Sequence, residues 1–140
     1  MKILALVILF LLLFYRIKST PSNLSKTIWR KRLQKSIDKM KEQEMNDTIK
    51  GASVLIVLFM ELFLIIFYVI LGTCSGTTTF IVLSVLQIMT CIVSTIKSLA
   101  DFNTAFSTDI NEHKFYRLWF LFNVVLDYIY YPMAIYMLLV

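Results

Sequence analysis

Four runs of apolar residues divide the chain and predict its main elements. They cover residues 3–15, 52–71, 80–96 and 118–140. A helix that crosses a membrane needs about 17–25 mostly apolar residues. The second and fourth runs are long enough, and the third becomes long enough with its threonine-rich flank. We therefore predict a three-helix transmembrane bundle in residues 51–140, with helices over 52–71, 78–97 and 116–138.

The first run, residues 3–15, is short for a membrane helix. Its thirteen residues cover about 20 Å at about 1.5 Å per residue, which is less than the hydrocarbon core. Lys2 precedes the run, but no small-residue cleavage site follows it, and this argues against a removed signal sequence. We expect residues 1–17 to form an N-terminal transmembrane anchor. A helix lying on the membrane surface and a cleaved signal are the alternatives.

Residues 18–50 predict a basic cytoplasmic amphipathic helix. Trp29, Leu33, Ile37 and Met40 recur at helical spacing and give it one apolar face, while basic residues occupy most of the remainder. A basic helix with a Trp on its apolar side suits an anionic lipid surface. It could also dock a partner protein, or only fix the topology and pack on the bundle. The residues expected at the membrane surface or partner are Trp29, Arg30, Lys31, Arg32 and Lys35.

The distribution of charge predicts the orientation of the chain in the cell membrane. Ten of the fourteen Lys and Arg residues lie at positions 16–50, and cytoplasmic loops carry such an excess of positive charge. The turn at 72–79 has no charged residue and fits the outside. The connector at 97–117 holds three basic and three acidic residues and fits the inside. We expect a multi-pass protein with both termini outside and the basic loop in the cytoplasm.

The overall composition indicates an all-α integral membrane protein. Apolar residues make up 59% of the chain and charged residues 16%, against about 45–50% and about 25% in soluble domains. Only three Gly and two Pro occur, which favours long helices over a barrel. The net charge of +5 comes from the basic loop, so it indicates anionic headgroups before nucleic acid. The expected fold is polytopic, with about four transmembrane helices plus the cytoplasmic amphipathic helix.

The chain lacks the residue patterns on which most catalytic and metal sites depend. His113 is its single histidine, and Cys74 and Cys91 are its only cysteines and are too far apart for a CxxC site. The sequence contains no glycine-rich phosphate loop and no Ser-His-Asp or zinc-protease pattern. We therefore expect no enzymatic activity, no cofactor and no bound metal.

Three polar residues are expected to form a layer within the membrane. Counted from the cytoplasmic ends of their helices, Glu61, Gln87 and Asp127 lie at similar depths of about 13–15 Å. Asn123 shares a helical face with Asp127. No Lys or Arg is expected at this depth. Because a carboxylate in the bilayer is costly, each acid should face a partner or a cavity rather than lipid.

The polar layer supports two hypotheses about function. In the first, its residues are hydrogen-bonding contacts between helices or subunits, and the chain is a small non-enzymatic accessory or assembly subunit of a larger membrane complex. In the second, Glu61 and Asp127 bind a cation or relay a proton. The chain would then be a self-associating proton- or cation-conducting pore, of which a holin-like protein is one form. The expected partners are the bilayer with its anionic headgroups and a membrane protein or further copies, and not nucleic acid.

Overall fold

The computed structural model describes residues 2–43 and 46–140, and the regular structure in these ranges is entirely helical. The all-α class is therefore confirmed for the described residues. Four of the helices are long and apolar enough to cross a membrane: α1, α3, α4 and α6. The elements in chain order are α1 (Lys2–Leu24), α2 (Lys26–Glu42), α3 (Asp47–Ser75), α4 (Thr78–Ala100), α5 (Phe102–Ala105), the 3-10 helix η1 (Ile110–Glu112) and α6 (Arg117–Leu139). The predicted anchor includes residue 1 and the predicted basic helix includes residues 44 and 45, which lie outside the described residues.

Helix α1 is longer than the apolar run that predicts it. The helix continues through Arg16 and carries Pro21 near its end at Leu24. Polar side chains in this extension bond to the helix itself, since the hydroxyls of Ser19 and Thr20 donate to the Arg16 carbonyl at 3.1 and 2.8 Å. The sequence prediction ended the segment near Arg16 because it treated the first charged residue as the boundary.

Helix α2 begins directly after α1, with Ser25 in extended conformation between them. Arg32 holds this corner, because its guanidinium donates to the Ser22 hydroxyl at 2.8 Å and to the Lys18 carbonyl at 3.1 Å. Ile37, on the predicted apolar face, is fully buried. The predicted basic helix over 18–50 is therefore divided: residues 18–24 belong to α1, residues 26–42 form α2, and residues 47–50 begin α3.

Helices α3 and α4 form a tight hairpin. Gly76 ends α3 with a φ of 65°, a left-handed conformation that favours glycine. Gly72 lies inside α3 instead of in the turn, and a Cβ atom there would stand 3.0 Å from the Cβ of Ser84 on α4. The connection is thus shorter than the predicted turn at 72–79, and the absence of a side chain at Gly72 lets the two helices approach closely.

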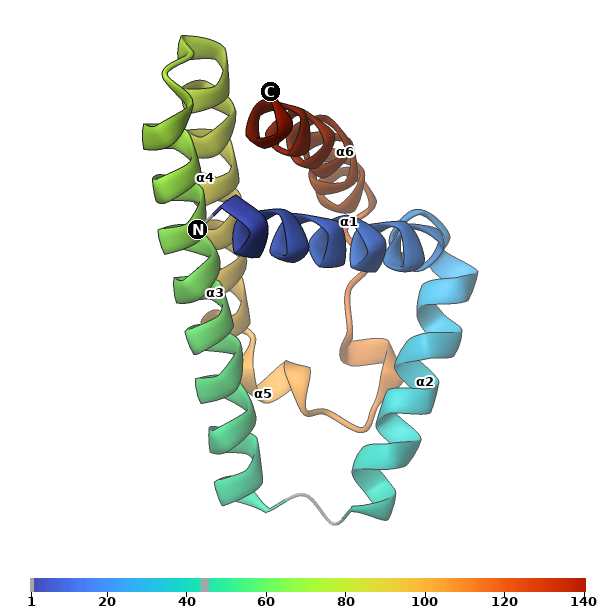
Figure 1. The fold of residues 1–140 in the computed structure, drawn as a ribbon. Coiled ribbons are helices and arrows are strands. Elements are labelled where there is room, and N and C mark those ends of the chain that lie inside the picture. The colour runs from blue at the N-terminus through green and yellow to red at the C-terminus, as the bar shows by residue number, and fades with distance from the viewer. Residues whose placement is uncertain (1, 44–45) are drawn as a thin grey trace.

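The long helices associate as two pairs that cross each other. α3 packs on α4, α1 packs on α6, and α6 also contacts α4. Figure 1 shows α1 nearly perpendicular to the α3–α4 hairpin: it begins beside α3 and runs away from the hairpin, and α2 descends from its far end. The central core cluster includes Leu9 of α1, Tyr68 of α3, Phe80 of α4 and Tyr130 of α6. The first helix is thus an integral part of the fold and not a separate anchor beside a three-helix bundle.

Candidate functional site

The structure brings Gln87 and Asp127 into direct contact. The side-chain amide of Gln87 on α4 donates to one carboxylate oxygen of Asp127 on α6 at 2.6 Å. Both residues are 3% exposed. A short hydrogen bond to a charged acceptor is stronger than one between neutral groups, so this contact ties α4 to α6 in the interior.

The second carboxylate oxygen of Asp127 forms an ion pair with the guanidinium of Arg16 on α1. This corrects the prediction that no basic residue lies at the depth of the acids. Arg16 lies inside α1, eight residues before its end at Leu24, so the ion pair joins the interior of α1 to the interior of α6.

Glu61 and Asn123 take no part in this contact. Both side chains are half-buried, and none of the hydrogen bonds among the described residues uses either of them. Of the predicted polar layer, the structure therefore joins Gln87 and Asp127 directly and adds Arg16.

Tyrosine hydroxyls provide further contacts between the long helices. Three of them come from one turn of α6 and reach three different helices. The pairs are Tyr68 with Tyr131 at 2.9 Å, Ser84 with Tyr130 at 3.0 Å and Thr20 with Tyr128 at 3.1 Å. The sequence analysis did not identify these pairs. The available signal was the group of tyrosines in the last apolar run, since a buried tyrosine hydroxyl usually has a polar partner.

The residues predicted for the membrane surface are used in two ways. Trp29 packs against Phe115, with ring centroids 5.2 Å apart, and Arg30 donates to Asn111 at 3.2 Å. Arg32 stabilises the α1–α2 corner. Lys31 and Lys35 are exposed. Trp29, Arg30 and Arg32 therefore contact other parts of the same chain. The exposed Lys31 and Lys35 give α2 a basic outer surface.

A cavity of about 780 Å³, lined by both charged and aromatic side chains, opens near the start of α6; it is called the polar cavity here because of its charged groups. The ammonium group of Lys97 lies within it, 4.4 Å from the ring centroid of Trp119 and 4.9 Å from that of Tyr116. Its wall also includes His113, whose Nε2 is 3.0 Å from the Ser107 carbonyl oxygen. Sequence reasoning missed this cavity because its lining comes from α2, α4, the connector and α6, which are far apart in the chain.

Among residues 2–43 and 46–140, no group of three or more His, Cys, Asp and Glu side chains is arranged to hold a metal ion. The carboxylate of Asp127 is occupied by two partners, which leaves Glu61 as the acid with the freer side chain. Comparison with protein-family models, with curated proteins and with solved structures finds no match for this chain.

Proposed function

We propose that this chain is a small, non-enzymatic integral membrane protein that serves as an accessory or assembly subunit of a larger membrane complex. The observation that carries the proposal is the use of Asp127. One of its oxygens accepts from Gln87 and the other forms an ion pair with Arg16, so the carboxylate connects three helices through partners within the chain. This is the arrangement of a structural contact.

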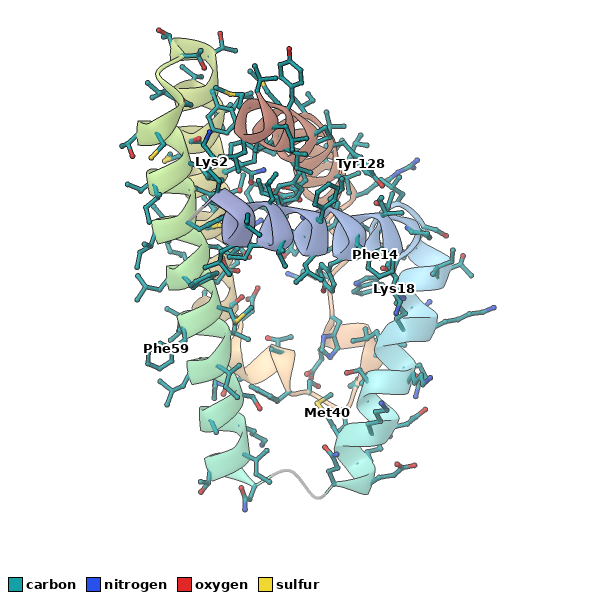
Figure 2. All side chains as sticks on the ribbon, in the orientation of Figure 1. Lys2, Phe14, Lys18, Met40, Phe59 and Tyr128 are labelled. Carbon is teal, nitrogen blue, oxygen red and sulfur yellow. The ribbon has the colours of Figure 1, made fainter. Side chains whose placement is uncertain are left out.

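The physics of membranes makes such contacts important for assembly. Lipid tails are as apolar as leucine, so helix association in lipid depends on close packing and on hydrogen bonds between helices. Here the close packing at Gly72 and the polar contacts of α6 stabilise the interior. The outer surface is apolar: Phe59, which is 70% exposed, projects from α3 away from the other helices (Figure 2). This surface of α3 meets lipid and, in our proposal, the partner protein.

The proposal includes an orientation, with the C-terminus and the α3–α4 turn outside and the basic α2 in the cytoplasm. Because α1 begins beside the middle of α3 (Figure 1), the outside position expected for the N-terminus is not part of it. The turn between α3 and α4 would then be extracellular, and Cys74 at that turn is exposed whereas Cys91 is buried. We expect a membrane-impermeant maleimide added to intact cells to label wild type at Cys74. Cys74→Ser should abolish the labelling, and Cys91→Ser should leave it unchanged. Labelling that requires disruption of the membrane would reverse the orientation.

A photo-crosslinking amino acid at Phe59 tests the subunit role. We expect one larger membrane protein to be captured in a fixed ratio when the native membrane is irradiated. The matched comparison is Phe14, which is 66% exposed on α1 and samples a different face of the molecule. Capture of lipid alone at both positions, together with a monomeric chain in mild detergent, would contradict the proposal.

Glu61 motivates a second candidate function, a self-associating proton- or cation-conducting pore. Its side chain is half-buried on α3 and forms no ion pair within the described part of the chain. Copies that associate through α3 would bring several such acids together. We expect a pore to give proton or cation flux in liposomes that Glu61→Gln abolishes while the oligomer persists. Absence of flux from reconstituted oligomers would exclude this function.

A further inference from the structure

Two cavities of different character meet near the proposed cytoplasmic side. The polar cavity of about 780 Å³ lies between α2, the end of α4 and the start of α6. A second cavity of about 270 Å³ lies between α3, α4 and α5, and most of its lining is apolar, including Val57, Leu99 and Phe102. Ser98 and Ala105 line both cavities. The two cavities therefore lie side by side with these two residues between them. Both residues are exposed, so one amphiphile lying over them can reach both cavities.

The polar cavity presents charges of both signs. Its lining includes two lysines and two carboxylates: Lys97, Lys114, Asp101 and Glu112. Tyr116 and Trp119 hold the Lys97 ammonium group at their ring faces. Such amphipathic aromatic rings are typical of the headgroup level of a membrane. A balanced set of charges at this level suits a group that carries both a phosphate and an amine better than a purely anionic group.

We propose that the two cavities together bind one phospholipid with an amine-bearing zwitterionic headgroup. The phosphate lies toward Lys97 and Lys114, since lysine binds phosphate as a point charge. The headgroup ammonium lies toward Asp101 and Glu112, and part of an acyl chain occupies the apolar cavity. The proposal depends on the chain being in a membrane, but it is independent of whether the chain is a subunit or a pore.

Lipid retention by the full chain tests the headgroup. The protein is purified in mild detergent, supplied with equal amounts of dioleoyl phosphatidylethanolamine and dioleoyl phosphatidylglycerol, and analysed by native mass spectrometry. We expect the zwitterionic lipid to be retained about tenfold more strongly. Glycerophosphoethanolamine, which has the headgroup without the chains, should not compete at the same concentration. Equal retention of the two lipids, or full competition by the soluble headgroup, would overturn the assignment to a zwitterionic phospholipid.

Two substitutions test the two cavities separately. Lys97→Gln removes the ammonium group and should weaken lipid retention about fivefold to tenfold. Lys39→Gln, at an exposed position of α2, is the control for the loss of a positive charge. Ala105→Trp places a large side chain between the two cavities and should prevent retention, whereas Ala52→Trp at an exposed position of α3 should not. Folding is checked by helical circular dichroism. If Ala105→Trp retains the lipid as strongly as wild type, the proposed site is refuted. If Lys97→Gln does not fold, Ala105→Trp and the comparison of the two headgroups test the site.

Discussion

The Arg16–Asp127 ion pair provides the strongest test of the fold. Arg16→Met leaves the Asp127 carboxylate with Gln87 as its remaining partner, and Asp127→Leu leaves the Arg16 guanidinium without its carboxylate. Removing one partner of a buried ion pair costs about 3–5 kcal/mol, and an unpaired charge in a membrane helix costs about 2.5–3.5 kcal/mol. The side chain of Arg16 is 21% exposed, which provides some solvation. We therefore expect each single substitution to lower the free energy of unfolding by about 2–3 kcal/mol.

The double variant Arg16→Met with Asp127→Leu measures the interaction energy between the two side chains, apart from the separate effect of each substitution. Replacing a whole buried pair with apolar residues is often close to neutral, but Asp127→Leu also leaves the buried Gln87 amide without its acceptor, which costs about 1–3 kcal/mol. The double variant should therefore cost about 2–3 kcal/mol instead of the sum of about 4–6 kcal/mol. The resulting coupling energy of about 2 kcal/mol is well above the error of such cycles, which is about 0.5 kcal/mol. Lys31→Met, at an exposed position of α2, is the matched control and should have little effect.

Reversible unfolding in bicelles or mixed micelles measures these values, with steric trapping as the readout of separated helices. The reasoning predicts coupling between a residue on α1 and a residue on α6 that are 111 positions apart in the sequence. A coupling energy near zero, with both single variants destabilised, would show that the two side chains act independently. The ion pair and the placement of α1 on α6 would then both be wrong.

Three further predictions follow from contacts between the helices. Gly72→Ala should destabilise the α3–α4 hairpin by about 1–3 kcal/mol, because the added Cβ would crowd Ser84. Gly51→Ala is the control: nothing lies within 4 Å of the added Cβ, so this substitution should be neutral or stabilising in the same unfolding assay. Tyr68→Phe and Tyr131→Phe should each lower the free energy of unfolding by about 0.6 kcal/mol, and the two effects should be non-additive because the residues share one hydrogen bond. Additive effects would contradict the contact. Tyr136→Phe, at a position that is 66% exposed, is the control. Arg32→Gln should increase amide hydrogen exchange at residues 18–26, because the substitution removes two hydrogen bonds at the α1–α2 corner. Lys31→Gln should leave the exchange unchanged. Equal exchange in both variants would exclude a role of Arg32 in stabilising this corner.

The positions of the long helices could be predicted from the sequence, and so could the contact between Gln87 and Asp127. Both depend on local information, namely the length of each apolar run and the count of residues from its ends. Arg16 was missed because its charge was treated as the end of the first run. The helix continues past Arg16 because the hydroxyls of Ser19 and Thr20 donate to the helix backbone, so these polar residues do not end it.

The crossing of the two helix pairs could not be predicted by counting residues. Depth counts assume that all helices run side by side, and they contain no information about crossing. The arrangement depends instead on contacts between distant residues of the two pairs, such as the hydrogen bonds of Tyr131 with Tyr68 and of Tyr130 with Ser84. The polar cavity depends on the same long-range packing, which explains why its residues were first assigned to separate roles.

One turn of α6 makes most of the polar contacts between helices. Asp127 reaches α1 and α4, Tyr130 reaches α4 and Tyr131 reaches α3. Pro132 follows directly and has no amide hydrogen to donate to the carbonyl four residues earlier, so the backbone of this turn lacks one of its own hydrogen bonds. Contacts with the neighbouring helices must therefore fix its shape. The carboxylate and the tyrosine hydroxyls of this turn therefore connect α6 to α1, α3 and α4 at the place where its own backbone bonding is weakest.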